Sequence, residues 1–319
     1  MRTRIQFKLL ALCLCLFASN LAALRADCIT APSGLIAWWR GENNALDQVG
    51  ANHGVMINGA TFAPGKVGAA FLFDGVNDSM SIANSPAFSN LPQISFSVWF
   101  KFNALPTNKW EMIITKGRVT GPNSNCFWLF RAADDDRLQA GVETAAGLSG
   151  VSTSQAFNDT NSFHLAIVTY DGAQVIFYLD GTPISTNFTT GNVRTDFDPI
   201  LIGQRNGPGV DGVGDVMNGL VDEAAVFNRA LTFQEAQALF DAGSAGMCVA
   251  PTLNIAPLPG AVRLTWTTNA TGYLLETNSV LTLPAGWGVL ASNYSILSTN
   301  FAVTNAIGGA TRFYRLHKP

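Results

Sequence analysis

The chain has 319 residues, enough for one large domain or two smaller ones, each with a full hydrophobic core. Charged residues make up only 13% of the chain, against about 25% in an ordinary soluble protein, and there are 30 glycines. Lys and Arg are scattered singly and the formal net charge is −3, so no nucleic-acid partner is predicted. This composition is typical of an all-β secreted protein.

The N-terminus has the pattern of a secretory signal peptide. Two arginines and a lysine precede an apolar run at 9–18, and alanines follow it. The run is too short to span a bilayer, which takes about 20 apolar residues, so no membrane span is predicted. Cleavage is predicted after Ala26, with Ala23 as the alternative, which gives a signal peptide at 1–26 and a secreted or cell-surface protein. Four of the 19 basic side chains leave with it, so 15 remain against 22 acidic ones.

The next part of the chain reads as short strands separated by turn residues. Apolar residues alternate or run continuously, and two Asp-Gly turns mark hairpins. About a dozen strands in series predict a two-sheet sandwich, because a single open sheet would leave one apolar face in water. Three tryptophans are predicted to pack between the sheets: Trp38, Trp39 and Trp99. The predicted strands are 35–40, 69–73, 79–82, 96–102, 111–116, 127–132, 138–142, 164–170, 174–179, 200–202 and 220–227.

One short helix is predicted after the last of these strands. Thr232 and Glu235 have the spacing of a capping box, in which both side chains bind free backbone amides at a helix start. Gly243 stands where a left-handed C-terminal cap is expected. The helix should therefore be two to three turns long.

Three cysteines remain after removal of the signal peptide. Cys28 and Cys248 flank the whole strand series, so we predict that they form a disulfide that ties the first and last strands together. In the chain-entropy model so long a loop contributes about 5 kcal/mol at most. Cys126 is predicted to be a small buried side chain rather than a reactive thiol.

The residues after Cys248 have a different pattern. The segment 249–259 carries three prolines and is either a linker or a first edge strand. The predicted domains are therefore 27–249 and 250–319, the second a small fibronectin III-like β-sandwich with Trp266 and Trp287 in its core. Its predicted strands are 261–266, 273–277, 288–291, 301–303 and 311–316.

Seven segments of the first domain occur in a characteristic order. Together they resemble a laminin G-like jelly roll of the concanavalin A-like lectin and glucanase superfamily, over residues 28–248. The resemblance implies an all-β jelly-roll sandwich that is more often a binding or adhesion module than an enzyme. The C-terminal residues resemble the small β domains that end many secreted proteins of environmental bacteria. The seven segments are GLIAWWRGENNALDQVGANHG at 34–54, GKVGAAFLFDGVNDSMSI at 65–82, FSVWFKF at 96–102, HLAIVTYDG at 164–172, FYLDG at 177–181, ILIG at 200–203 and VDEAAVFNRALTFQEAQALF at 221–240.

Catalysis of glycoside hydrolysis needs two carboxyl groups about 5 to 10 Å apart across a cleft. The glucanases of this superfamily carry them on one strand as E-x-D-x-x-E, and this spacing is missing here. Glu111 and Glu143 are isolated in sequence, and Asp222 and Glu223 would point to opposite sides of a strand. The chain is therefore predicted not to be an enzyme.

A calcium site is predicted from four acids, because a hard cation takes several oxygen ligands. Asp74 and Asp78 lie in a turn after a strand, Glu42 follows the first strand, and Asp222 lies on the last. If the first and last strands are adjacent, Glu42 and Asp222 can share one ion. The alternative is that Asp74 and Asp78 serve turn hydrogen bonds and that Glu42 is solvated.

Ligand contacts are predicted at Trp110, Trp128 and Arg131, since sugar binding needs an aromatic surface with polar groups beside it. The alternative for both tryptophans is a place in the core. The function predicted is a secreted, non-catalytic module that binds a glycan or an extracellular surface protein with the help of calcium. The alternative is a structural or adhesion spacer of the cell envelope without a small ligand.

Overall fold

The computed structural model describes most of the chain from residue 28 to residue 317. The predicted signal peptide at 1–26 lies outside the described residues, and so does residue 250 at the predicted domain boundary. Within the described part, no helix is both long enough and apolar enough to cross a membrane. The described ranges are 28–105, 109–117, 125–205, 215–249, 251–267, 273–281, 286–290, 294–298, 300–308 and 311–317.

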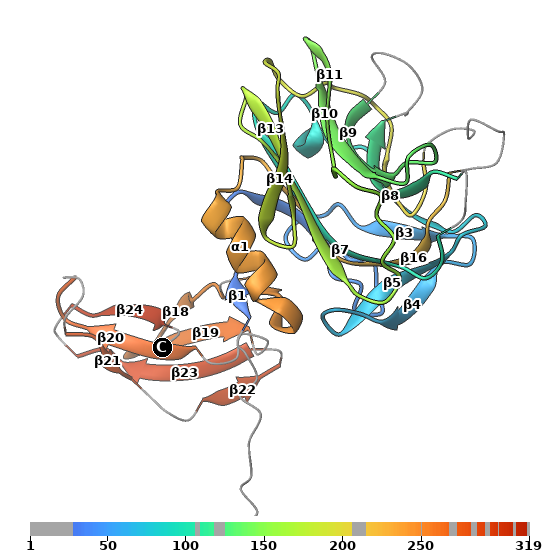
Figure 1. The fold of residues 1–319 in the computed structure, drawn as a ribbon. Helices are drawn as coiled ribbons and strands as arrows, with labels where there is room; N and C mark the ends of the chain where they lie inside the picture. Colours follow the sequence, from blue (N-terminus) through green and yellow to red (C-terminus); the bar gives the residue numbers. More distant parts are fainter. Residues whose placement is uncertain are drawn as a thin grey trace, which may run out of the picture.

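Two antiparallel sheets face each other in a β-sandwich (Figure 1). One sheet consists of β3 (Gly54–Ile57), β6 (Ser79–Ile82), β8 (Glu111–Gly117), β9 (Asn125–Arg131), β10 (Leu138–Thr144), β11 (Gly147–Ser152) and β15 (Ile200–Ile202). The order of these strands in the sheet is β11-β10-β9-β8-β15-β6-β3. We call it the seven-stranded sheet.

The eight-stranded sheet covers the other side of the core. It consists of β2 (Leu35–Trp39), β4 (Thr61–Pro64), β5 (Ala69–Asp74), β7 (Ile94–Phe102), β12 (His164–Tyr170), β13 (Gln174–Leu179), β14 (Thr182–Phe188) and β16 (Asn218–Phe227). The order is β14-β13-β12-β7-β16-β5-β4, and β2 pairs with the second half of β16. The first and last long strands, β2 and β16, are therefore neighbours, as the calcium prediction required.

Large aromatic side chains fill the space between the two sheets. Phe96, Phe100 and Phe102 alternate along β7 and are almost fully buried, as the period-two pattern predicted. The ring of Phe96 stacks on that of Phe127 from the opposite sheet, with 5.0 Å between the centroids. The all-β sandwich predicted from the sequence is confirmed.

The predicted helix is present as α1 (Phe233–Asp241), and it begins as predicted. The Thr232 hydroxyl accepts a hydrogen bond from the backbone amide of Glu235, and the Glu235 carboxylate accepts one from the amide of Thr232. Gly243 follows the helix with a φ of +53°, the left-handed conformation that was expected. Hydrogen bonds from Arg229 hold the pKa of Glu235 well below its usual range, at about 2.

The placement predicted for the three tryptophans is right for one and wrong for two. Trp39 packs in the core between the sheets, whereas Trp38 and Trp99 lie on the outer face of the eight-stranded sheet. Leu239 of α1 packs against this outer cluster, and the Phe240 ring stacks on Trp99 at 5.8 Å. The helix is thus a cover for the second apolar face of this sheet.

The predicted disulfide between Cys28 and Cys248 is present. The adjoining strands β1 (Ile29–Thr30) and β17 (Met247–Cys248) pair in parallel, and the two cysteine Cα atoms lie 5.6 Å apart. Cys126 is buried with a free thiol, as predicted. The two ends of the sandwich sequence are therefore joined both covalently and by backbone hydrogen bonds.

Loss of this disulfide should destabilise the sandwich. We expect Cys248→Ser, made together with Cys28→Ser, to lower the free energy of unfolding by about 2–5 kcal/mol, because the unfolded chain regains the freedom of a 220-residue loop. Urea denaturation followed by tryptophan fluorescence measures the change. Cys126→Ser is the matched control, since this thiol is not cross-linked; an equal stability of the double variant and the wild type would contradict the expectation.

The predicted strands are all present within a few residues, but several strands were missed. The missed strands are short or lie at sheet edges, where polar and exposed residues hide the period of two. They are β1, β3, β4, β11, β14, β17 and a strand at Ser295–Leu297.

The C-terminal residues form two smaller sheets around a core of their own (Figure 1). Leu264, Trp266 and Leu275 are fully buried there, so Trp266 has the core position that was predicted. Trp287 lies instead beneath the Arg315 guanidinium, 4.4 Å from its ring centroid. The sheets are β18-β19-β23-β22 and β21-β20-β24, with β18 (Asn254–Leu258), β19 (Ala261–Thr267), β20 (Leu274–Asn278), β21 (Gly288–Val289), β22 (Ser295–Leu297), β23 (Asn300–Ala306) and β24 (Phe313–His317).

Candidate functional site

The outer face of the seven-stranded sheet is the first candidate for a binding surface. Residues directly opposite one another in neighbouring strands point to the same face of a sheet. The strand register therefore defines one row of outward-pointing positions across all seven strands. From β3 to β11 this row is Val55, Ser81, Leu201, Thr115, Trp128, Gly141 and Gly150.

Trp128 lies in the middle of this outer row. A Cβ atom on Gly141 would stand 2.7 Å from Cζ2 of the indole, so the ring rests directly on the backbone of β10. Only 6% of Trp128 is exposed. Beside it, the Thr115 hydroxyl is buried and has no hydrogen-bond partner among the described residues. This position fits the core alternative for Trp128 better than a sugar-stacking role.

Trp110 and Arg131 lie at one end of the same strands. The Trp110 ring packs edge-on against Phe130, with centroids 4.9 Å apart, and is half-buried. Arg131 is buried, and its guanidinium lies between the carboxylates of Glu111, at 3.4 Å, and Asp136, at 2.7 Å. The structure thus brings the three predicted ligand residues to one part of the sheet, but only Trp110 offers open surface.

Buried carboxyl groups on this sheet do not form a catalytic pair. Burial raises the pKa of Glu111 to about 8, a shift that by itself suggests a functional acid. The register places Glu111 opposite Arg131 and Glu143 opposite Cys126, five residues away along β9. At about 3.3 Å per residue this is about 16 Å, beyond the separation that glycoside hydrolysis uses. The nearer acid, Asp136, is separated from Glu111 by the Arg131 guanidinium.

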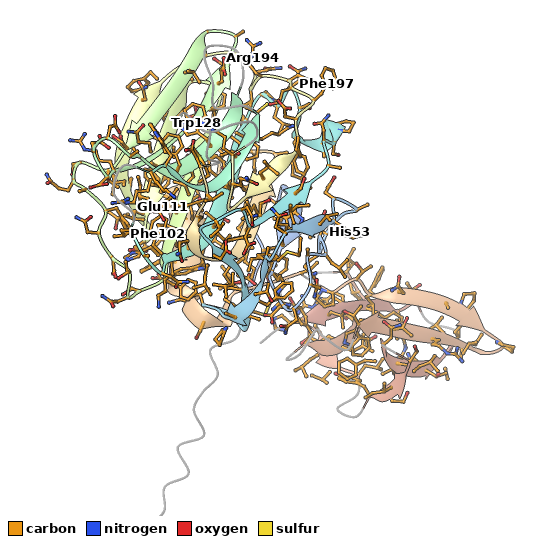
Figure 2. The ribbon with its side chains drawn as sticks, turned by 90° about the vertical axis from the view of Figure 1, so that its right-hand side faces the viewer. His53, Phe102, Glu111, Trp128, Arg194 and Phe197 are labelled. Atoms are coloured by element: carbon orange, nitrogen blue, oxygen red, sulfur yellow. A yellow bond between two sulfur atoms is a disulfide. The ribbon has the colours of Figure 1, made fainter. Side chains whose placement is uncertain are left out.

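A loop at the other end of these strands carries an exposed aromatic residue that sequence reasoning missed. Phe197 is 87% exposed, and Arg194 on the same loop donates its backbone amide to the carbonyl of Glu143 on β10. Figure 2 shows Arg194 and Phe197 beyond one side of Trp128, and Glu111 on the opposite side. Phe197 lies outside any strand pattern, so only its exposure in the folded chain distinguishes it.

The second candidate site is a turn between β4 and β5, at residues 65–68, with two of the predicted calcium ligands beside it. Asp222 Oδ2 accepts a hydrogen bond of 2.9 Å from the amide of Val67, and Glu42 Oε2 accepts one of 3.3 Å from Ala69. A Cβ on Gly65 would stand 2.5 Å from Asp222, and one on Gly68 would collide with Glu42. Only glycines permit both carboxylates to approach the turn so closely.

Asp222 is fully buried at this turn. Its second oxygen, Oδ1, has no hydrogen-bond partner among the described residues, and burial raises the pKa of this carboxyl to about 8. A buried oxygen without a partner is costly unless the group is protonated or a cation neutralises it.

Glu223 is the neighbouring acid, and the expectation that it points away from Asp222 was too simple. The register of β16 against β7 shifts between Asp222 and Ala225, and Glu223 has a φ of +51°. Its carboxylate accepts hydrogen bonds from the Trp38 indole, at 3.1 Å, and from Arg40, at 3.3 Å. Burial raises its pKa to about 7 despite the Arg40 charge. A non-glycine residue with a positive φ is strained, and such strain is typical of functional sites. Here the strained residue, Glu223, is a buried acid next to a second buried acid, Asp222.

The other predicted calcium ligands, Asp74 and Asp78, lie apart from this turn. Asp74 is the last residue of β5, whereas Glu42 binds the amide of Ala69, the first residue of β5. The acids Asp74 and Asp78 therefore lie at one end of β5, and Glu42 lies at the other end. Asp78 accepts hydrogen bonds from the amides of Gly59 and Asp74, the turn role that was the alternative. Among the described residues no group of three or more His, Cys, Asp or Glu side chains is arranged to hold a metal. A site with all four acids is therefore not formed.

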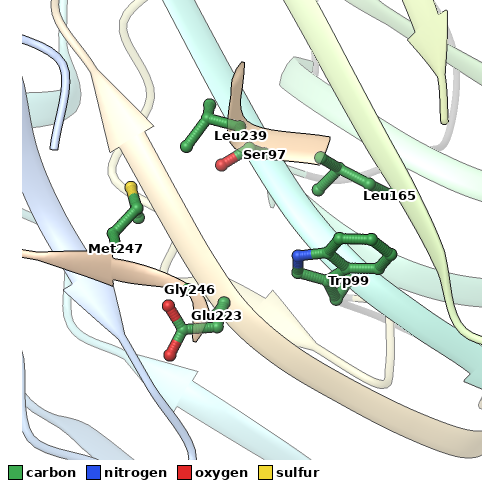
Figure 3. Close-up of a pocket in the computed structure, with 7 residues that line it drawn as sticks. All are labelled: Ser97, Trp99, Leu165, Glu223, Leu239, Gly246 and Met247. Carbon is green, nitrogen blue, oxygen red and sulfur yellow. The ribbon is translucent and has the colours of Figure 1, made fainter. Parts of the chain in front are cut away.

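Two cavities lined by described residues are both smaller than an ordinary ligand pocket. The cavity beneath α1 has a volume of about 10 Å³, room for one water, and Glu223, Trp99 and Ser97 face it (Figure 3). A hollow on the C-terminal sheets, beside Val262 and Tyr314, measures about 180 Å³. Small-molecule pockets are usually about 300–1,000 Å³.

The sandwich order, the disulfide and the closing helix can now be compared with known proteins. The family model described as the concanavalin A-like lectin/glucanases superfamily matches residues 74–237, just over half of the chain. The chain belongs to this superfamily. No curated protein sequence matches the chain.

Several solved structures are similar in fold to this chain. Domain 4 of an extracellular GH43 arabinanase from Geobacillus stearothermophilus, in complex with arabinotriose, aligns with a TM-score of 0.50 and 17% identity over 64% of this chain and 96% of its own. The binding domain of paraclostridial mosquitocidal protein 1 aligns with a TM-score of 0.53 and 13% identity; the match spans 78% of this chain and 61% of that one. The binding domain of botulinum neurotoxin DC, in complex with SialylT, aligns with 0.50 and 10% identity over 77% and 74%. At these identities the likeness shows the fold alone.

Asp222 and Glu223, the two buried acids on β16, have raised pKa values, and these predict that the stability of the protein depends on pH. We call the turn 65–68 together with Glu42 and Asp222 the acidic turn. In the folded state Asp222 and Glu223 hold protons that the unfolded chain releases above about pH 4, so the free energy of unfolding should fall as pH rises toward 8. We expect the melting temperature in EDTA to fall between pH 5 and pH 8.5, and Asp222→Asn to reduce that fall. Circular dichroism melts measure it, with Asp74→Asn as control; equal pH slopes for Asp222→Asn and wild type would contradict the assignment.

Proposed function

We propose that this protein is a secreted, non-catalytic module that recognises a glycan or another extracellular surface macromolecule. The superfamily match carries the proposal, because residues 74–237 include most strands of the sandwich and the residues Trp110, Trp128 and Phe197. Its fold neighbours include an arabinanase domain in complex with arabinotriose and a toxin binding domain in complex with SialylT. The signal-peptide pattern at 1–26 supports secretion.

The contact surface we propose is the open rim of the seven-stranded sheet. Phe197 is a strongly exposed ring, and Arg194 lies three residues earlier on the same loop with a partly exposed side chain, so an apolar face and a polar group of the kind that sugar recognition needs come from one loop. Trp110 offers the second exposed aromatic edge, at the other end of the strands. Trp128 and Arg131 are buried, so in this proposal they pack beneath the contact surface and do not touch the ligand.

The absence of catalysis is part of the proposal. Glu111 and Glu143 are too far apart to flank one glycosidic bond, and the Arg131 guanidinium fills the space between Glu111 and Asp136. Glu111 is thereby held in an ion pair and not presented to a cleft. Its raised pKa follows from burial.

We further propose a calcium ion at the acidic turn, held by Glu42, Asp222 and backbone carbonyl oxygens. The residues present fit such an ion in two respects: a buried Asp222 oxygen lacks a partner among the described residues, and Gly65 and Gly68 let the Asp222 and Glu42 carboxylates approach the same turn. When bound, the ion supplies charge neutralisation. The chain itself supplies the irregular part of β16 that holds Asp222 against the turn.

Calcium should stabilise the protein and do so more strongly at higher pH, because the ligands must be ionised. At a calcium concentration 100-fold above the Kd, the stabilisation is about 2.7 kcal/mol, or roughly 5 °C or more in melting temperature. We expect the shift against EDTA in wild type and in Asp78→Asn, and its loss in Asp222→Asn. Differential scanning fluorimetry measures it. If calcium does not change the melting temperature of the wild type, the calcium proposal is wrong. If the change is lost only in Asp78→Asn, the ion is bound by Asp74 and Asp78 instead.

A glycan and polysaccharide array probed with residues 27–319, in calcium and in EDTA, tests the binding function. We expect a hit that Phe197→Ala weakens at least tenfold, since truncating a central aromatic contact costs about 2 kcal/mol or more. Phe188→Ala is the matched control, because this ring is also largely exposed and lies on β14 at the edge of the other sheet. Binding that depends on Phe188 and not on Phe197 would place the contact surface elsewhere.

A blank array in both buffers would favour the second candidate, a structural or adhesion spacer of the cell envelope. The observation behind this candidate is the second β unit after Cys248, which packs around its own core. We propose domains at 27–249 and 250–319, the second a fibronectin III-like sandwich resembling the C-terminal β domains of secreted bacterial proteins. In a spacer, this unit sets the distance between the sandwich and the rest of an assembly.

A further inference from the structure

Lys116 is a fully buried lysine at the inner face of the seven-stranded sheet. It stands on β8 directly between Phe127 and Ile200 of the neighbouring strands, which point into the core. Its side chain has no exposed surface. A buried amino group is costly unless nearby groups bind it, and lysine is rarely buried in this way.

Three oxygen atoms surround the Lys116 Nζ atom. They are the side-chain carbonyl Oδ1 of Asn84, at 2.9 Å, a carboxylate oxygen of Asp196, at 2.8 Å, and the backbone carbonyl of Asp198, at 2.9 Å. Asn84 follows β6 and the two aspartates precede β15, and both strands lie on the same side of β8 in the sheet. An amine, a primary amide and a carboxylate are thus within one hydrogen-bond length of a common point.

The Asp196 carboxylate is held in place from its other side. Its Oδ2 accepts a hydrogen bond of 2.9 Å from the thiol of Cys126. Burial raises the pKa of that thiol, so it remains a neutral donor. Asp196 itself is 16% exposed. One oxygen of this carboxylate is therefore fixed by Cys126 while the other faces the Lys116 amine.

We propose that Lys116 and Asn84 form an intramolecular isopeptide bond, with Asp196 as the group that carries the proton. The protonated Lys116 amine passes a proton to Asp196, and the nitrogen lone pair attacks Cγ of Asn84. The new N–C bond forms as the bond from Cγ to Nδ2 breaks; Asp196 gives its proton to the departing nitrogen and then takes the second proton from the new amide nitrogen. The products are an amide between the two side chains and ammonia, so no oxidant or cofactor is needed.

The geometry favours attack at this amide. The Asn84 oxygen that Nζ contacts is bonded directly to the carbon under attack, so the reacting atoms are already close to a near-attack arrangement. Because the Lys116 side chain is buried, its attacking amine is shielded from water. Asn84 is exposed, so the ammonia that it releases can leave to solvent. The bond would join β8 to the segment after β6, two strands that are not direct neighbours.

Intact-mass spectrometry of the full chain after reduction of its disulfide tests the proposal. We expect a mass about 17 Da below that of the sequence, the mass of one ammonia. Trypsin should yield residues 67–101 covalently linked to residues 110–118, because an acylated Lys116 is no longer a cleavage site. An unshifted mass, or a shifted mass without the linked peptides, would overturn the proposal.

Three variants separate the roles of the groups. Asn84→Ala and Lys116→Arg should show the full sequence mass, and so should Asp196→Asn, which keeps both partners of the bond but not the proton carrier. Asn161→Ala is the matched control, since it removes another exposed asparagine and should keep the mass deficit. A deficit that persists in Asp196→Asn would overturn its role. The wild-type mass decides the main point even if a variant fails to fold.

Discussion

The pairing of β16 with β7 is the contact on which the sandwich depends. β16 runs beside β7 over nearly its whole length and also pairs with β5 in its first half and with β2 in its second. A change of register between Asp222 and Ala225 separates the two halves. This bulge bends the strand so that one strand can join two different neighbours on its other side. Asp222 then binds the turn before β5, and Glu223 binds Trp38 and Arg40.

The eight-stranded sheet is apolar on both faces, and this constrains everything attached to it. Its inner face packs on the seven-stranded sheet, while Trp38, Trp99 and Phe227 make the outer face equally apolar. The short helix α1 and the segment ending at Cys248 cover that outer face. The helix covers this face, and the disulfide and the strand pair β1–β17 fix the segment that follows the helix to the start of the domain.

Charged groups in this protein are few, and many are buried in pairs that fasten loops to strands. Arg131 joins Glu111 to Asp136, Lys116 joins two loops, and Glu223 binds Arg40. Removing one partner of such a pair leaves an uncompensated buried charge, which costs more than a surface ion pair contributes. With only 13% charged residues, the chain relies on these few buried groups for the position of its loops.

The sequence alone determined the sandwich, the closing helix and the disulfide, because side-chain periods of two and 3.6 residues, a capping box and flanking cysteines are local signals. It also predicted that Glu42 and Asp222 come close if the first and last strands are adjacent, and in the structure both acids bind backbone amides near the same turn. Only the tertiary structure decided that Asp74 lies elsewhere, that Trp128 is covered and that Phe197 is exposed. These placements depend on strand register and on the path of loops in the folded chain. Both bring residues that are far apart in sequence into contact, and neither leaves a pattern that can be read locally.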